Sequence, residues 1–233
     1  MPAFQTTRWS MVARAGGEDE ESREAALDLL CRAYWKPAHQ FVVNSGRDEE
    51  SARDLVQEFF SRGLQRNWLA SADPERGRFR SYLLVVLKRF LADERIWSGR
   101  QRRGGGAAHV SIELVDSDRL KEPGSSPEAA YDRQWALTVL ERAADQLRAE
   151  CDAAGKARHF ELLAPFLDGD GRDIGHAAAA DALGMSTGAV AMAIGRLRSR
   201  MRDLVRREVA ATLADEADVE AELAELIAAL RPH

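Results

Sequence analysis

One amphipathic segment, from Ser51 to Leu64, constrains the fold of this chain more than any other feature. Its apolar residues recur at the i, i+3, i+4, i+7 spacing that gathers side chains on one face of an α-helix. These residues are Ala52, Leu55, Val56, Phe59, Phe60 and Leu64. Asp48 or Ser51 is expected to cap the N-terminus, where early acidic residues also suit the helix dipole. The segment is predicted to be a helix that buries one face.

Helical spacing extends along most of the 233 residues. A helix is predicted from Leu27 to Ala38 with an interruption at Pro37, because proline removes a backbone donor. Another is predicted from about Arg80 to Trp97, with a C-cap at Ser98-Gly99. Apolar residues make up 45% of the chain, enough for a core, and abundant Ala, Leu, Arg and Glu favour helices. We therefore expect an all-α protein.

Glycine and proline divide the chain into four parts. Three glycines open a linker at 104, and a Pro-Gly-Ser-Ser-Pro run closes it at 127. The predicted organisation is two small helical domains, 1–103 and 128–207, joined by the flexible linker 104–127, with an acidic helical C-terminal extension at 208–233. The extension carries an apolar stripe, which must pack on something. Its members are Val219, Leu223, Leu226, Ile227 and Leu230.

The helix at 51–64 also has a polar face opposite its apolar one. Asp54, Gln57, Glu58 and Ser61 stand at i, i+3, i+4 and i+7. One interpretation is an ordinary solvated face. The other is a docking ridge for a basic partner surface, since complementary charge guides association.

Positive charge is concentrated in two places, although the net charge is −5. Between Arg76 and Arg103 the bases are interrupted only by Asp93 and Glu94, and between Arg196 and Arg207 only by Asp203. Segregated charge of this kind can bind a polyanion locally. The first segment also interleaves aromatic residues, which suits single-stranded DNA because bases stack on rings. The alternative is that the aromatics are core residues and the arginines only solubilise.

The segment Ala177–Arg200 has the pattern of a helix-turn-helix. We expect its first helix to pack through four residues, Ala178, Ala179, Ala182 and Leu183. Gly184 suits the turn, and Ser186 suits the N-cap of a second helix running to about Arg207. Val190, Ile194 and Leu197 would form the core face of that second helix and leave Thr187, Gly188, Ala191 and Gly195 toward solvent or DNA. An ordinary helical hairpin is the alternative.

Nothing in the sequence indicates an enzyme, a metal centre or a cofactor. The five histidines are scattered, and no phosphate-binding loop, zinc-protease motif or nucleophile elbow is present. Cys31 and Cys151 are far apart and belong to no metal-binding pattern, so we interpret them as buried filler, with a redox sensor as the alternative. With no apolar run of membrane-spanning length, we expect a cytoplasmic protein without membrane insertion.

Together these features resemble the extracytoplasmic-function (ECF) sigma factors of the sigma-70 family. Residues 48–60 resemble region 2.2, which in that family docks on the largest core polymerase subunit. Residues 79–83 resemble the Phe-x-x-Trp-Leu start of the helix after the promoter-melting loop, with Tyr82 in place of Trp. Asp93, Arg95 and the bases at 100–103 resemble the end of region 2.4, and residues 177–202 resemble region 4.

The resemblance implies a function and three sets of binding residues. The chain would be an alternative sigma factor that binds core RNA polymerase and directs initiation at promoter DNA. The polymerase-binding residues would be Asp54, Gln57, Glu58 and Ser61. The −10 DNA-binding residues would be Asn67, Trp68, Arg76, Arg78, Arg80, Lys88, Arg89 and Arg95. The −35 DNA-binding residues would be Ser186, Thr187, Gly188, Ala191, Arg196, Arg198 and Arg200.

Two alternatives to a sigma factor remain open. One is a stand-alone helix-turn-helix regulator that binds a palindromic operator as a dimer. The other is a sigma-like protein that docks on polymerase without initiating, which is favoured by the small residues Ala191 and Gly195 where relatives carry larger polar ones. The C-terminal extension is expected either to fold back on the second domain or to bind a regulator, such as the anti-sigma proteins that hold many ECF factors.

Overall fold

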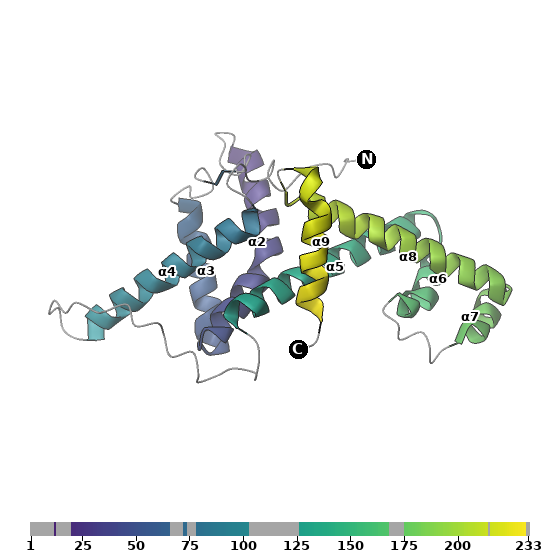
Figure 1. The fold of residues 1–233 in the computed structure, drawn as a ribbon, viewed down its shortest axis with the longest axis horizontal. Helices are drawn as coiled ribbons and strands as arrows, with labels where there is room; N and C mark the ends of the chain where they lie inside the picture. The colour runs from purple at the N-terminus through teal and green to yellow at the C-terminus, as the bar shows by residue number, and fades with distance from the viewer. Residues whose placement is uncertain are drawn as a thin grey trace. The chain divides into compact units, whose positions relative to one another are not determined.

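The computed structural model describes residues 12, 20–65, 72–73, 78–102, 126–167, 175–213 and 215–231. All regular secondary structure within these ranges is helical, which confirms the all-α expectation (Figure 1). The helices are α2 (Glu20–Asn44), α3 (Glu49–Gln65), α4 (Phe79–Arg102), α5 (Pro127–Ala153), α6 (Ala157–Leu163), α7 (Gly175–Leu183), α8 (Thr187–Ala210) and α9 (Val219–Leu230). Two 3₁₀ turns, η3 (Ala164–Phe166) and η5 (Glu216–Asp218), complete the set.

The chain forms two compact units that differ from the predicted division. Unit 1 comprises residues 1–138 and 210–233, and unit 2 comprises residues 139–209. The boundary therefore falls inside α5, and the chain returns to unit 1 after α8. The residues expected to form the linker, 104–127, lie outside the described part of the chain up to 125, and α5 begins at Pro127.

The core of unit 1 is formed by α2, α3, α4 and the first part of α5. Four of the six residues predicted for the apolar face of α3 are buried, namely Ala52, Val56, Phe59 and Phe60. Leu55 is half-buried, and the side chain of Leu64 lies outside the described residues. Aromatic contacts join the helices. The ring centroids of Tyr34 in α2 and Phe79 in α4 are 5.3 Å apart, and those of Phe59 and Phe90 are 5.6 Å apart. The second is close enough for a favourable tilted ring contact between α3 and α4.

The expected interruption at Pro37 and the expected helix end at Ser98-Gly99 are both wrong. Helix α2 continues through Pro37, although proline removes one backbone donor. Tyr34, Ala38 and Phe41 are buried on both sides of it, so tertiary packing outweighs the lost hydrogen bond. Helix α4 likewise runs through Ser98-Gly99 to Arg102 instead of ending there.

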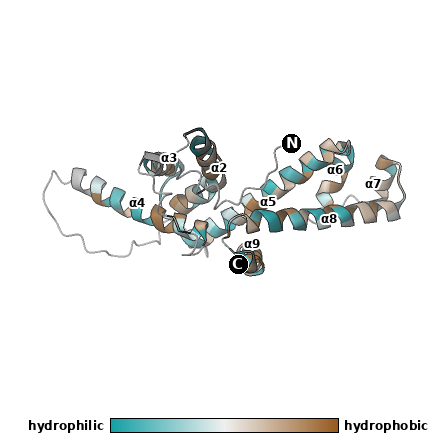
Figure 2. Cartoon of the chain, turned by 90° about the horizontal axis from the view of Figure 1, so that it is seen from above, coloured by the Kyte–Doolittle hydropathy of each residue, from teal (hydrophilic) through white to brown (hydrophobic). Residues whose placement is uncertain are grey.

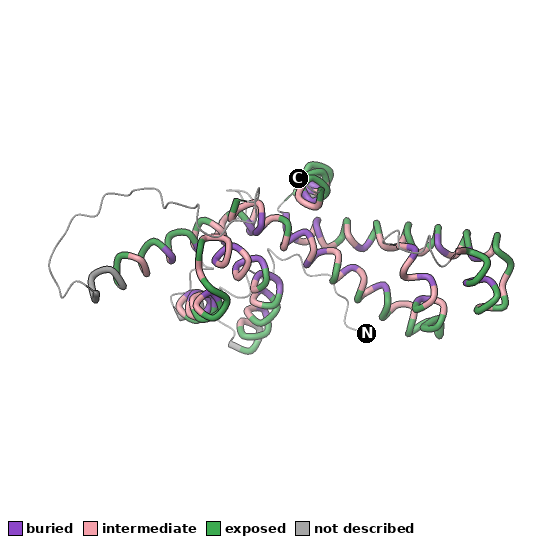
Figure 3. Tube along the Cα trace, turned by 90° about the horizontal axis from the view of Figure 1, so that it is seen from below, coloured by how far each residue is buried: buried purple, intermediate pink, exposed green. Residues whose placement is uncertain are grey.

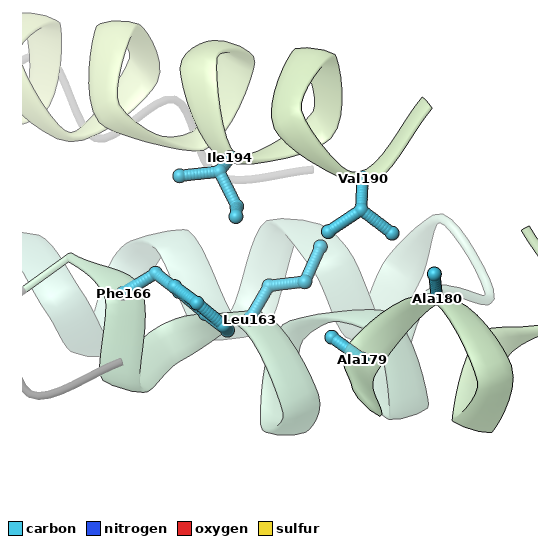
Figure 4. Packing of buried hydrophobic residues seen from close by; sticks show 6 residues of the cluster. All are labelled: Leu163, Phe166, Ala179, Ala180, Val190 and Ile194. Atoms are coloured by element: carbon cyan, nitrogen blue, oxygen red, sulfur yellow. The ribbon is translucent and has the colours of Figure 1, made fainter. Parts of the chain in front are cut away.

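Unit 2 is held by two apolar clusters. In one, Val190 and Ile194 point from α8 toward Leu163, Phe166, Ala179 and Ala180, as Figure 4 shows. The other joins α5, α6 and α8 through Ala143, Leu147, Phe160 and Leu204. Hydrophobic and hydrophilic residues interleave along α8 in Figure 2, as expected for a helix with one buried face.

The expected packing of the first helix in the helix-turn-helix segment was partly wrong. Ala179 is buried as predicted, and Leu183 packs against the cluster as a half-buried residue. Ala178 and Ala182 are exposed, and Ala180 is buried instead. Because α7 has only nine residues and four consecutive alanines, its apolar pattern does not define one face.

Helix α9 forms in the C-terminal extension and belongs to unit 1, where it meets residues before α4 and in the first part of α5, including a hydrogen bond of 3.4 Å from Arg133 to the Leu230 carbonyl. Its buried residues are Val219, Glu222 and Leu226, while Ile227, predicted to pack, is 54% exposed. A glutamate at the centre of the buried face requires a buried cationic partner.

A search of the described helices finds none that is both long and apolar enough to cross a membrane alone, although the bent α7–α8 pair passes the same length and composition test.

Candidate functional surfaces

The polar face of α3 is exposed where the sequence predicted a docking ridge. Asp54, Gln57 and Ser61 are exposed, opposite the buried Val56 and Phe59. Glu58 is different, because its carboxylate accepts a hydrogen bond of 2.6 Å from Arg62. Three of the four predicted residues thus present their side chains on one rigid helix.

Arg62 connects this ridge to α4. Its guanidinium donates to Glu58 on one side and to Glu94 of α4 on the other, both at 2.6 Å. It also lies 5.4 Å from the ring centroid of Phe90, within cation–π range. The α3 ridge is therefore held in register with α4 by one arginine.

The start of α4 carries a buried charge network that sequence reasoning assigned to DNA. Arg80 is only 7% exposed, and its guanidinium lies 4.7 Å from the ring centroid of Trp135. Its Nε atom donates to Glu222 at 2.7 Å, and its Nη2 atom donates to Glu225 at 2.7 Å. Asp132 of α5 accepts a further hydrogen bond from Nη1. A buried arginine that meets several carboxylates and an aromatic ring is a structural centre.

Arg78 precedes α4 and shares two of these acids. Its Nη1 atom is 2.7 Å from Glu222 Oε2 and also pairs with Glu225. Its side chain is 27% exposed, against 8% for that of Arg80. Arg78 therefore reaches solvent in a way that Arg80 does not.

The pKa values in this network follow from burial and charge. Burial opposes the positive charge of Arg80, but the charges of Glu222, Asp132 and Glu225 outweigh it and raise the pKa of Arg80. The pKa of Asp132 is raised, mainly by burial, although Arg80 opposes that effect. The hydrogen bond from Arg78 lowers the pKa of Glu225, so its carboxylate stays charged at neutral pH.

The remaining described cations of α4 are more accessible. Lys88 is exposed and pairs with Glu128 at 2.6 Å, and Arg89 is exposed. Burial lowers the pKa of Arg95, and the charge of Arg47 lowers it further. Exposed positions recur along α4 in Figure 3. Three apolar residues lie among them, Val85, Ile96 and Trp97. The predicted site residues Asn67, Trp68 and Arg76 lie outside the described residues.

Helices α7 and α8 meet at a sharp turn. Gly184 has φ +63°, in the left-handed region that favours glycine, and the two helices are bent by 97°. The Ser186 hydroxyl accepts a hydrogen bond of 3.2 Å from the Ala189 amide, as expected of an N-cap. A bend near 90–120° across a short glycine turn is the geometry of a helix-turn-helix.

Most of the predicted base-contacting positions at the start of α8 are small residues. Ser186, Thr187, Gly188, Ala191 and Gly195 are all exposed. Three of them have no hydrogen-bonding side chain, so few base-edge contacts are available from this face.

The three predicted arginines of α8 are in different situations. Arg196 is exposed. Arg198 donates a 2.7 Å hydrogen bond to the carbonyl of Phe166, and Arg200 makes two 2.7 Å hydrogen bonds to the carboxylate of Glu150. Of these three arginines, Arg198 and Arg200 are thus tied to neighbouring segments, and Arg196 is the one most accessible to a ligand.

The network residues Glu222, Glu225 and Asp132 were missed by sequence reasoning. A local signal exists for one of them, because Glu222 stands at i+3 from Val219 and i−4 from Leu226, on the helix face that those residues bury. Its partner Arg80 lies 142 positions away, and no local pattern indicates that pairing.

Comparison with known proteins identifies no relative: no family model matches the chain, and neither a curated protein nor a solved structure matches it significantly. Within the described residues, no group of three or more His, Cys, Asp and Glu side chains is placed to hold a metal ion.

Proposed function

We propose that this chain is a sigma-type initiation factor that binds core RNA polymerase and directs transcription from specific promoters. The observation that carries the proposal is the α7–α8 pair, with its 97° bend, its turn glycine at positive φ and an exposed helix N-terminus followed by arginines. Such a helix can lie in the major groove with its basic half near phosphates. The order of α3, α4 and this pair along the chain agrees with the sigma-factor resemblance.

The polymerase-docking role is supported by the exposed polar face of α3. Asp54, Gln57 and Ser61 project from a helix whose opposite face is buried in the core of unit 1. A polar ridge on a rigid helix suits a basic partner surface, because its backbone loses little conformational freedom on binding. Glu58 contributes less net charge to this ridge, since it is already paired with Arg62.

The −10 role is supported by the accessible part of α4. Arg89 is exposed, and the residue Trp97 is 56% exposed. Single-stranded DNA binds surfaces that offer both cations for phosphates and aromatic rings for stacking. Capture of an extruded base also costs a few kcal/mol of unstacking, about the amount that such contacts return.

A second candidate function is polymerase docking without initiation. The exposed face of the first half of α8 favours it, because Gly188, Ala191 and Gly195 offer no hydrogen-bonding side chains to base edges. This candidate shares the α3 ridge with the first and differs only in the absence of promoter-specific transcripts.

Co-elution with sigma-free core RNA polymerase tests the shared part of both candidates. The full chain should co-elute, and an Asp54→Lys/Gln57→Lys variant should not, because the ridge changes sign. The control is Glu161→Lys, a charge reversal at an exposed position on α6 in unit 2. Loss of binding in the control as well, or retention in the ridge variant, would rule out docking through α3.

Run-off transcription on genomic fragments then separates the two candidates. Discrete transcripts that depend on the chain identify an initiation factor, and co-elution without transcripts identifies the docking protein. Tight operator binding by the chain without polymerase would instead identify the stand-alone regulator.

A further inference from the structure

Carboxylates of helix α9 pair with Arg78, just before α4, and with Arg80, in its first turn. Glu222 is fully buried and receives Arg78 and Arg80 on its two carboxylate oxygens, each at 2.7 Å. Glu225 lies one turn further on and pairs with both arginines as well. The sequence resemblance assigns both arginines to the promoter strand. Carboxylate and phosphate oxygens make the same kind of charge-assisted hydrogen bond to a guanidinium, so they compete for it.

The two arginines depend on α9 to different degrees. Arg80 is also held by Asp132 and Trp135 of α5, and its backbone carbonyl accepts a 3.1 Å hydrogen bond from the Tyr131 hydroxyl. The ion pairs that the described structure gives Arg78 are with Glu222 and Glu225, both on α9. Release of α9 would therefore leave Arg80 in place and make Arg78 available.

The way in which α9 is held suits a reversible contact. The helix has 12 residues, a length that is marginal in water unless packing supports it. Its buried face places Glu222 between the apolar residues Val219 and Leu226, so its docking depends in part on charge. Replacing a buried ion pair by apolar residues often stabilises a protein, which means that this pair holds α9 less firmly than a leucine contact could.

We propose that α9 is an intramolecular lid that competes with single-stranded DNA for Arg78. In the closed state, Glu222 and Glu225 neutralise Arg78. In the open state, the phosphates of the DNA strand take their place, while Arg80 stays bound to α5. This inference rests on the proposed function, because it assigns regulation to the −10 surface.

The test uses the full chain without polymerase and a fluorescently labelled single-stranded oligonucleotide of mixed sequence. Glu225→Gln weakens the half-exposed contact and leaves the buried one. We expect this variant to bind the oligonucleotide about two- to fivefold more tightly at low salt, the range that an exposed ion pair supplies. Asp218→Asn is the matched control, because it removes the same charge from an exposed position at the N-terminus of α9 and its side chain makes no cap hydrogen bond.

A double-variant cycle assigns the gain to Arg78. Adding Arg78→Ala to Glu225→Gln should abolish the tighter binding, because the freed cation is then absent. An equal change in the Asp218→Asn control, no change in Glu225→Gln, or a gain that persists without Arg78 would each overturn the lid.

Hydrogen exchange of the unaltered chain gives a second readout that needs no variant. Saturating oligonucleotide should speed exchange of the α9 amides while those of α2 stay protected. Unchanged α9 exchange in the DNA-bound chain would show that α9 is a fixed part of unit 1 and would reject the proposal. Because both measurements omit polymerase, their outcome is independent of the co-elution test: a lid can fail in a genuine initiation factor, and can operate in a protein that does not initiate.

Discussion

Units 1 and 2 are both helical, but the helices that are far apart in sequence are joined by different kinds of contact in each unit. Unit 2 joins α5, α6, α7 and α8 through apolar clusters, and its Arg200–Glu150 pair is partly exposed at the edge. Unit 1 also has an apolar core, yet its last helix, α9, is held by the buried Arg80–Glu222 ion pair as well as by the apolar residues Val219 and Leu226. Apolar clusters contribute strongly to stability and can repack around small changes. A buried ion pair contributes little net stability, but it requires a partner of opposite charge in a defined position. The comparison indicates that charge pairing helps to fix where α9 docks on unit 1.

Each unit contains one free thiol, which allows the two to be followed separately. Cys31 lies on α2 in unit 1, and Cys151 lies on α5 in unit 2. Burial, with a smaller effect from Asp28, raises the pKa of the Cys31 thiol to about 11. Burial also raises the pKa of the Cys151 thiol. Both thiols are half-buried, and alkylation requires the thiolate, so the raised pKa values slow labelling in the folded chain and a faster rate reports opening.

The largest expected effect is that of Glu222→Ala. The variant leaves the Arg80 guanidinium buried with one partner fewer, and breaking a buried pair in this way costs about 3–5 kcal/mol of unfolding free energy. Urea denaturation should measure the loss, and alkylation of Cys31 should accelerate while that of Cys151 does not. An Arg80→Met/Glu222→Leu chain should recover most of the stability. A loss of unfolding free energy below about 1 kcal/mol would contradict the view that the buried Arg80–Glu222 pair stabilises unit 1.

Ile194→Ala is the matching change in unit 2. Ile194 is 3% exposed between α8 and the α6–α7 side of the cluster, so its truncation should cost about 2–5 kcal/mol. Alkylation should now accelerate at Cys151 and not at Cys31. The control is Met192→Ala, because Met192 is 65% exposed on the same helix and its loss should stay within about 0.5 kcal/mol. Equal acceleration of both thiols would show that the units open together.

A smaller effect is expected at the α7–α8 turn. Gly184 has φ +63°, and a Cβ added there would meet nothing within 4 Å, so Gly184→Ala tests backbone strain alone. The expected cost is about 1–2 kcal/mol by thermal or urea unfolding. Gly184→Asn should cost less, since asparagine tolerates this conformation better. Equal costs for both substitutions would contradict the strain explanation.

The smallest effect is expected for Glu150→Gln. This carboxylate and Arg200 are both about one-third exposed, so the pair should contribute only about 0.2–1 kcal/mol. The hydrogen bond from Arg200 lowers the pKa of Glu150 from 4.5. The contribution is therefore present above pH 4.5 and is lost as the pH falls through the lowered value. Unfolding curves of the two chains should converge in acid, and a constant difference at all pH values would contradict this account.

Local periodicity was sufficient to predict much of the fold. The apolar face of α3 and the extent of α8 follow from spacing, because both helices bury one continuous stripe. The continuation of α2 through Pro37 was not predictable, since it depends on packing against buried residues of other helices. The position of α9 was equally inaccessible, because it depends on a partner 142 residues earlier.

The candidate surfaces were predicted unevenly for the same reason. Exposure of Asp54, Gln57 and Ser61 follows from their place opposite a buried stripe. Arg78 and Arg80 were grouped with exposed cations because they are close in sequence, yet they meet carboxylates from α5 and α9. Charge clusters in a sequence identify cations, but the tertiary structure decides which of them remain available to a ligand.

The return of the chain to unit 1 after unit 2 has a consequence for biosynthesis. Domains generally fold from the N-terminus as the chain leaves the ribosome. Here α2, α3 and α4 emerge early, but the carboxylates of α9 that complete the Arg80 network follow all of unit 2. Until then Arg80 has Asp132 alone among the acids of the finished network. Unit 1 is thus the first to begin folding and the last to finish, and a chain that ends before α9 leaves Arg80 with a single carboxylate partner in the core of unit 1.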